Sequence, residues 1–274
     1  VMNNWFPGMD LSQDDRYTEK NADLLAARAR QALFEFVPIR RSPDNAERIY
    51  RSRVYGDLVE VFMLDLRSYR GPNSSGRQTV RDASTSMLGD PQFAWLKEAL
   101  RASQATWKII ATDLPLGLVV QDYPRNGQPA FEAWANGDDG VPLGRELELA
   151  QLLSFMKREG IHNTIWITAD VHYGAAHHYS PERAAFTDFD PFWELVAGPM
   201  NAGTYGPNTL DHTFGPEVRF LAIPEGMKPN RPPSAGFQFF GVLEADPTTR
   251  VLTMSLHDIE GTRLWSEDLE PVGG

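Results

Sequence analysis

The stretch ITADVHYGAAHHYSP, residues 167–181, decides the fold. It continues an apolar run, NTIWITA over residues 163–169, that is typical of a buried strand. The run ends in Asp170 and His172, which are separated by a single valine. Because alternate residues of an extended backbone point to the same face, we expect this carboxylate and this imidazole to lie side by side. Such a pair suits a transition metal; the alternative is an aspartate that caps a turn beside a histidine held by an ordinary hydrogen bond.

Two earlier apolar runs end in the same way. Residues 57–65, DLVEVFMLD, finish in Asp65, and residues 107–112, WKIIAT, are followed by Asp113. The carboxyl ends of neighbouring strands share one edge of a layered sheet, where the loops are free to carry ligand-binding groups. Converging carboxylates repel one another unless a cation holds them, and the usual cation is a metal. We therefore expect Asp113 to meet Asp170 in one site.

The rest of the chain predicts a mixed α/β fold in a single domain. Apolar residues recur at helical spacing in three segments, over residues 19–36, 91–104 and 144–159. Residues 71–90 and 121–143 are rich in Gly, Ser, Asn or Pro and are expected to be loops. After residue 190 the chain has five strand-like runs, and the spacing of the last three predicts an antiparallel meander.

Composition narrows the possible functions. The 274 residues are 42% hydrophobic, which is enough for a sizeable core. The net charge of −11 argues against a nucleic-acid or anionic-membrane surface. No run of 18 apolar residues predicts a membrane span. The absence of cysteine excludes disulfides, Cys-ligated metals and thiol nucleophiles.

Several segments together resemble the C-terminal portion of PhoD-type alkaline phosphatases. They are VFMLDLRSYRGP, WLKEALRASQATWKIIATDLPLGLVV, ITADVHYGAAHHYSP and WELVAGPMNAGTYGP, and the opening VMNNWFPG resembles the residues that follow the family's Asp-Asp-His-Glu motif. The resemblance implies a calcineurin-like metallophosphoesterase fold, with two face-to-face sheets flanked by helices and metals at the strand ends. It also implies hydrolysis of phosphate monoesters or diesters.

The resemblance also suggests metal ligands and catalytic residues. Asp170 and His172 match the family's last ligand motif, and Asp113 occupies a strand end where relatives place an earlier ligand. Asn4 belongs to the Asn-Asn pair after the His-Glu motif and is a candidate for the calcium site. The implied metals are iron and calcium, with zinc or manganese as alternatives.

Three further residues are candidates for substrate binding. Arg67, in LDLRSYR, could contact phosphate or lock a loop. His177 follows the ligand motif and is expected to support the ligands or contact the substrate. Asn201 lies among small residues in GPMNAGTYG and is a candidate pocket contact.

Two of the family's motifs, a Gly-Asp-x-x-Tyr segment and Asp-Asp-His-Glu itself, do not occur in this sequence. Residues 1–274 are therefore expected to be the C-terminal part of one metallophosphoesterase catalytic domain, completed by the N-terminal half of the same precursor. By resemblance, we expect a periplasmic or secreted enzyme with a twin-arginine leader upstream. The alternatives are a phospholipase D-like or phosphotriesterase activity on the same fold, or an inactive fragment that acts as a binding or structural module.

Overall fold

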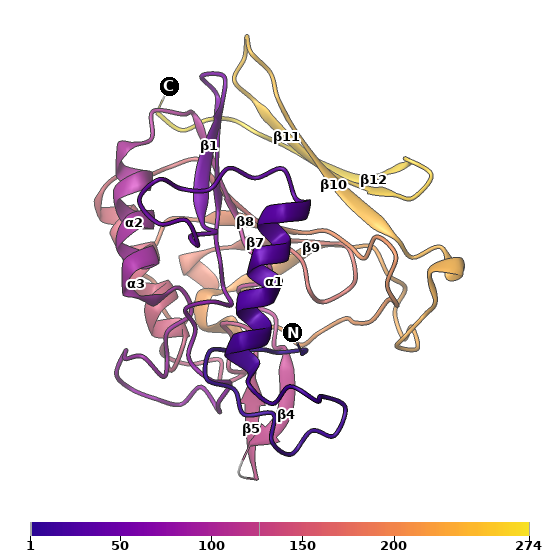
Figure 1. The fold of residues 1–274 in the computed structure, drawn as a ribbon. Coiled ribbons are helices and arrows are strands. Elements are labelled where there is room, and N and C mark those ends of the chain that lie inside the picture. The colour runs from indigo at the N-terminus through magenta and orange to yellow at the C-terminus, as the bar shows by residue number, and fades with distance from the viewer. Residues whose placement is uncertain (1, 126, 274) are drawn as a thin grey trace.

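The computed structural model of the chain describes residues 2–125 and 127–273, and its centre is a mixed sheet of seven strands (Figure 1). The strands lie in the order β1-β2-β3-β6-β8-β7-β9. Their bounds are β1 Arg51–Tyr55, β2 Val59–Met63, β3 Trp107–Ala111, β6 Thr164–Thr168, β7 Ala175–Tyr179, β8 Phe192–Val196 and β9 Pro216–Leu221.

Four neighbouring strands of this sheet, β2, β3, β6 and β8, run parallel. Both faces of the sheet are covered there, which is why three of these strands were readable as apolar runs. Met63 of β2 is opposite Ala111 of β3, and Ala111 is opposite Ile167 of β6. The three strands therefore finish side by side, and the segments that follow them leave from one edge of the sheet.

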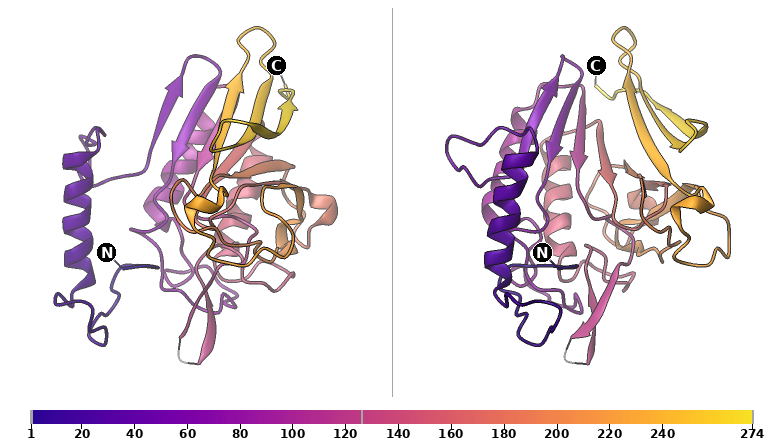
Figure 2. Two further views of the ribbon diagram at one scale, coloured as in Figure 1. Left: turned by 90° about the vertical axis from the view of Figure 1, so that its right-hand side faces the viewer. Right: turned by 45° about the vertical axis from the view of Figure 1, so that its right-hand side comes forward.

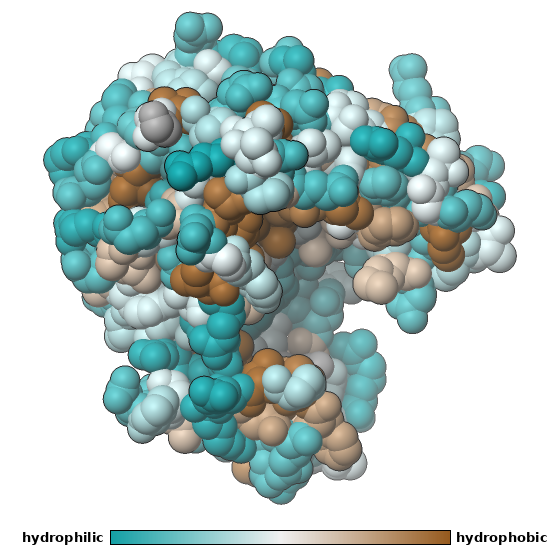
Figure 3. Space-filling model, turned by 90° about the horizontal axis from the view of Figure 1, so that it is seen from above, coloured by the Kyte–Doolittle hydropathy of each residue, from teal (hydrophilic) through white to brown (hydrophobic). Residues whose placement is uncertain are grey.

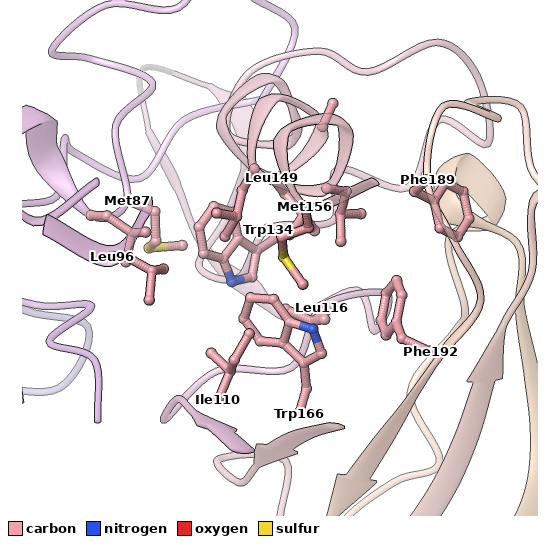
Figure 4. Packing of buried hydrophobic residues seen from close by; sticks show 14 of the residues in the cluster. Met87, Leu96, Ile110, Leu116, Trp134, Leu149, Met156, Trp166, Phe189 and Phe192 are labelled. Carbon is pink, nitrogen blue, oxygen red and sulfur yellow. The ribbon is translucent and has the colours of Figure 1, made fainter. Parts of the chain in front are cut away.

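Helices α2 (Gly89–Ala102) and α3 (Glu146–Arg158) pack on one face of the sheet. Figure 4 shows this core: the indole of Trp166, from β6, lies beneath that of Trp134, with Ile110 close by. Both indoles are fully buried among leucine, methionine and phenylalanine side chains. Helices α2 and α3 agree with the expected segments within two residues at each end.

A three-stranded antiparallel sheet packs against the other face. Its strands are β10 (Phe239–Ala245), β11 (Leu252–Asp258) and β12 (Arg263–Leu269), so the predicted meander is confirmed. Met254 of β11 shares an apolar cluster with Trp107 and other residues of the large sheet. The mixed α/β class is confirmed. The complete metallophosphoesterase sandwich stays a prediction, because this second sheet has only three strands in the described chain.

Helix α1 (Ala22–Phe36) stands apart from these layers and is joined to β1 by an extended segment (Figure 2). It begins three residues later than expected, and its N-terminal cap is Asn21. The Asn21 side chain accepts a hydrogen bond from the Leu24 backbone N–H at 3.1 Å. This bond satisfies one of the free donors at the helix start.

The segment 121–143, expected to be a loop, contains a hairpin of β4 (Gln121–Arg125) and β5 (Gln128–Phe131). The strands β1 and β7 were also not predicted, because neither has an alternating or continuous apolar pattern. Within residues 2–125 and 127–273, short 3₁₀ turns lie at Pro181–Arg183, His212–Phe214 and Pro233–Ala235.

The molecular surface is mostly hydrophilic in the view of Figure 3, with apolar residues gathered around a hollow. No helix in the described part of the chain is long and apolar enough to cross a membrane.

Candidate active site at the carboxyl edge of the sheet

One arginine side chain gathers the acidic groups at the strand ends. The Nε atom of Arg67 donates to Oδ2 of Asp113 at 2.8 Å, and its Nη2 lies 3.8 Å from Oδ1 of Asp170. A third nitrogen of the same guanidinium, Nη1, donates to Glu132. The structure therefore brings Asp113 and Asp170 together, and the cation between them is Arg67.

Asp65, the third strand-end aspartate, does not join this group. Its Oδ1 atom accepts hydrogen bonds from the backbone N–H groups of Arg67 at 3.0 Å and Ser68 at 2.9 Å. Gln92 of α2 fixes the backbone of Asp65. Its Oε1 accepts from the Asp65 N–H, and its Nε2 donates to the Asp65 carbonyl oxygen, both at 2.8 Å. Asp65 thus shapes the turn that presents Arg67 to the site.

The turn that carries Asp170 and His172 is not extended. Their φ angles are +67° and +63°, in the left-handed region that side-chain-bearing residues seldom adopt. The expected geometry, with both side chains on one face of an extended strand, is therefore wrong. Within the turn, the backbone N–H of Val171 donates to the carbonyl of Ala169 at 2.8 Å. Backbone strain of this kind costs on the order of 1–3 kcal/mol per residue and clusters at functional sites.

The His172 ring is oriented by a neighbouring loop. Its Nδ1 lies 2.7 Å from the carbonyl oxygen of Gly203, and its ring meets that of Tyr205 edge to face at 5.5 Å between centroids. A carbonyl only accepts, so Nδ1 carries the proton in this contact and Nε2 keeps its lone pair. Metal-binding histidines usually have this arrangement, in which the second nitrogen is held by a backbone carbonyl.

The electrostatics of the site are set by burial and by these charges. Burial, and then repulsion from Glu132, raises the pKa of Asp170 to about 6, while Arg67 opposes the shift. Glu132 is only 4% exposed and lies between Arg67 and Arg70. Burial, and then repulsion from Arg67, lowers the pKa of Arg70 to about 10. Positive and negative groups are thus packed together, with Glu132 and Arg70 buried and Asp113 partly exposed.

Asn4 lies in a neighbouring polar network. Its Nδ2 donates to Oδ1 of Asp122 at 2.6 Å, and Nδ2 of Asn73 donates to the other carboxylate oxygen at 2.8 Å. Arg145 donates to Asn73 Oδ1 at 2.9 Å and to the carbonyl oxygen of Glu132 at 2.7 Å. The N-terminal segment is thereby linked to the Arg67 group. No hydrogen bond in the described chain joins Asn4 to the two site aspartates directly.

A buried carboxylate, Glu194 of β8, connects the segments that lead into the site. Its Oε1 accepts hydrogen bonds from the Leu116 N–H at 2.8 Å and the Thr168 hydroxyl at 3.1 Å. Its Oε2 accepts one from the Tyr179 hydroxyl at 2.6 Å and lies 3.2 Å from Nδ1 of His177. Glu194 therefore joins the segment after Asp113 to the strand before Asp170.

The structure gives His177 a supporting role only. Its side chain is 1% exposed and faces Glu194, so the expected contact with a substrate does not fit its position. Asn201 is exposed, and its side chain makes no hydrogen bond to the described residues of the site. The loop that contains Asn201 reaches the site through the backbone of Gly203 instead.

Four residues of the site were not predicted from the sequence, namely Glu132, Arg70, Arg145 and Glu194. Glu194 had a visible signal, because a lone carboxylate inside the apolar run WELV must find buried partners. Glu132 had none, because it lies in a segment of loop-like composition, 65 residues from its partner Arg67.

The donor set fits a metal site in part. Asp113, Asp170 and His172 offer carboxylate oxygens and an oriented imidazole, which are ligands that iron, zinc, manganese or calcium accept. In the described part of the chain, however, no three His, Asp or Glu side chains are grouped closely enough to hold a metal ion. The Arg67 guanidinium occupies the space between the two carboxylates instead.

The chain is an α/β protein, and its acidic, histidine-bearing group lies at the carboxyl edge of the parallel strands, where proteins of this class carry their ligand sites. Comparison with known proteins identifies the family. A family model of PhoD-like phosphatases matches residues 1–256, and the chain belongs to that family.

One curated protein and one solved structure are similar to this chain, the structure in its fold. Alkaline phosphatase D of Bacillus subtilis (strain 168) is 30% identical over 160 residues, which cover 54% of this chain and 26% of that protein. A solved structure of PhoD superposes with a TM-score of 0.57 at 19% identity, and the match covers all of this chain and 54% of that one. The chain thus spans about half the length of the solved relative.

Proposed function

We propose that this chain forms part of a metal-dependent phosphatase that hydrolyses phosphate monoesters, diesters or both. The observation that carries the proposal is the meeting of Asp113 and Asp170 around Arg67, beside His172 with its oriented ring. Membership of the PhoD-like family and the name of the Bacillus relative support phosphoester hydrolysis as the reaction.

Asp113, Asp170 and His172 would hold the metals. Asn4 would support the site through the hydrogen bonds that link it, by way of Asp122 and Asn73, to the Arg67 group. Iron and calcium are the proposed ions, since carboxylates suit calcium and imidazole suits iron. Bound metals would supply an activated water and would neutralise the phosphate oxygens. The residues present contribute orientation: Gly203 fixes the His172 ring, and Glu194 fixes the two segments that lead to the aspartates.

Arg67 is the proposed phosphate-binding residue. A guanidinium offers several N–H donors in a plane, a geometry that matches the oxygens of a phosphate. In the present structure three nitrogens of Arg67 are directed at three carboxylates. A cation that neutralises Asp113 and Asp170 would remove the reason for two of these contacts, and the guanidinium would then be available to an anionic substrate.

Other parts of the enzyme are proposed to lie outside this chain. The solved relative is about twice as long as the matched region, which supports a second, N-terminal half that completes the catalytic domain and the metal coordination. A location in the periplasm or outside the cell, reached through a leader upstream of residue 1, is part of the same proposal. The resemblance to alkaline phosphatase D supports it.

The test is to measure the metal content of the intact enzyme and its turnover of three substrates. These are p-nitrophenyl phosphate, bis-p-nitrophenyl phosphate and a choline phospholipid. We expect bound metal and release of phosphate or nitrophenol from one or both phenyl esters, and loss of both in Asp170→Asn. Cleavage of the phospholipid alone would favour the phospholipase D-like alternative. A folded, metal-free protein with no turnover would overturn the proposal.

A further inference from the structure

An arginine groove lies beside the sheet edge described above. It has a volume of about 660 Å³ and is formed where the segment after α1 meets strand β1. Figure 2 shows this segment crossing from α1 to β1. Five arginines line the groove, namely Arg40, Arg41, Arg48, Arg51 and Arg53, and no Asp or Glu is among its lining residues in the described chain.

This concentration of positive charge stands out in an acidic protein. The chain has 26 Lys and Arg against 37 Asp and Glu, so a groove lined by arginine without any acid runs against the overall balance. Like charges held in one concave surface repel one another and focus a positive potential. The effect is visible at Arg51, whose pKa is lowered by burial and then by Arg53 and Arg48.

The guanidinium groups have no carboxylate partner in the described residues. Arg51 donates only to backbone carbonyls, those of Ile49, Arg40 and Arg48. Arg53 likewise donates only to the carbonyl of Ser52. The backbone therefore holds these side chains in place and leaves their positive charge uncompensated, which is the arrangement that an anionic ligand requires.

The groove begins at the same edge of the sheet as the candidate active site. Arg51 is opposite Met63, which also lines the groove, and Met63 is at the end of β2. Ile167 lies opposite Met63 two strands away, and the chain continues from Ile167 to Asp170. Because neighbouring strands lie about 4.8 Å apart, the backbones of Met63 and Ile167 are about 10 Å apart.

We propose that this arginine groove is a second anion-binding site, which holds a ligand that carries several phosphate groups in one chain. The choice of phosphate over carboxylate rests on the proposed function, because the groove adjoins a site expected to act on phosphate esters. The planar donors of arginine match phosphate oxygens in pairs, so a row of phosphates is bound more tightly than a single one.

The experiment is calorimetric titration of the protein with sodium tripolyphosphate, compared with inorganic phosphate and citrate. Arg40→Ala with Arg53→Ala removes two guanidiniums that make no hydrogen bond to another side chain of the described residues. We expect this pair to weaken tripolyphosphate binding at least tenfold. The matched control is Arg158→Ala with Arg263→Ala, which removes the same two charges from exposed positions elsewhere. We expect it to leave the affinity within about twofold, because loss of two distant charges changes only the screened, long-range field.

Equal weakening in the control pair would overturn the proposal, because binding would then follow net charge alone. Citrate that binds as tightly as tripolyphosphate would overturn the choice of phosphate. Hydrolysis of p-nitrophenyl phosphate, measured on the same variants, separates this proposal from the proposed function. We expect Arg40→Ala with Arg53→Ala to retain monoester turnover. Absence of turnover in every variant would count against the phosphatase, while the titration would still decide the groove.

Discussion

The carbonyl oxygen of Gly203 lies 2.7 Å from Nδ1 of His172, and this contact determines which ring nitrogen is left for chemistry. The two residues are 31 positions apart in the chain. The loop after β8 thus reaches over the turn after β6 and holds its imidazole by the backbone. The hydrogen bond that orients the ring therefore comes from the backbone of that loop, and the edge-to-face contact with Tyr205 adds to it.

His172→Ala should abolish the chemistry and leave the fold nearly intact. We expect phosphatase turnover and metal affinity to fall at least about 100-fold, since even supporting partners of metal ligands are worth 10- to 100-fold. The half-buried ring makes one hydrogen bond, so its loss should lower the free energy of unfolding by only about 1 kcal/mol. Activity, metal analysis and urea unfolding measure these effects. The exposed His162→Ala is the control, and equal activity in both variants would refute the assignment.

Arg67→Ala should destabilise the protein by about 3 kcal/mol, because Glu132 is buried and would lose its nearest cation. Arg67→Lys keeps the charge, but one ammonium cannot reach three carboxylates. We therefore expect the free energy of unfolding to fall by about 1 kcal/mol. Urea unfolding provides the measurement. Arg158→Ala, at an exposed position, is the control and should change stability by less than about 0.5 kcal/mol. If Arg67→Ala is as stable as this control, the pairing has no energetic role.

Glu194→Ala should lower the free energy of unfolding by about 3–5 kcal/mol, since it leaves buried donors on three segments without their acceptor. Glu194→Gln keeps the shape of the side chain but replaces one accepting oxygen by a donor. The free energy of unfolding should therefore fall by about 1–3 kcal/mol. Thermal or urea unfolding can rank the two variants. The partly exposed Glu217→Ala serves as the control on the neighbouring sheet edge. A neutral effect of Glu194→Ala would show that the network does not hold these segments.

The buried Glu146 predicts a specific pH dependence of stability. Burial, and then the nearby Asp211, raises the pKa of Glu146 to about 9. Between pH 4.5 and about 9 the unfolded chain has lost this proton while the folded chain keeps it. Stability should therefore fall as pH rises through this window, by up to about 1.4 kcal/mol per unit. Glu146→Gln should flatten the slope, because an amide does not titrate in this range. An amide oxygen at the position of Oε2 can still accept from the Asn136 side chain and from the Leu143 N–H.

Urea unfolding at a series of pH values tests this dependence. The exposed Glu98→Gln is the matched control on α2 and should keep the slope of the unchanged protein. An identical slope in Glu146→Gln would show that another group is responsible.

Much of the fold was predictable because the parallel strands are covered on both faces. Burial on both sides makes β2, β3 and β6 read as continuous apolar runs. The edge strand β1, RSRVY, carries charge and exposed side chains, so its pairing with β2 depends on tertiary contacts rather than on its own pattern. The β4–β5 hairpin was missed for a related reason, since Pro124 lies inside it and Pro usually excludes a strand.

Only the site residues that directly follow an apolar strand could be predicted from the sequence. Asp113 and Asp170 were found because acids follow apolar runs. The partnership of Arg67 with Glu132 joins residues 65 positions apart, and no local pattern encodes such a contact. The left-handed turn at Asp170 and His172 was missed because positive φ is signalled mainly by glycine, and neither residue is one.

The left-handed turn at Asp170 and His172 lowers the stability of the protein in order to place two side chains of the site. Both residues hold a backbone conformation that glycine would adopt at little cost, so the chain gives up conformational free energy to place a carboxylate and an imidazole there. Asp170→Gly should accordingly raise the free energy of unfolding by about 1 kcal/mol and remove the activity, which unfolding and turnover measurements on one preparation can establish. Any programme that selects this protein for thermostability alone would therefore drift toward glycine at this turn, and its most robust products would be inert.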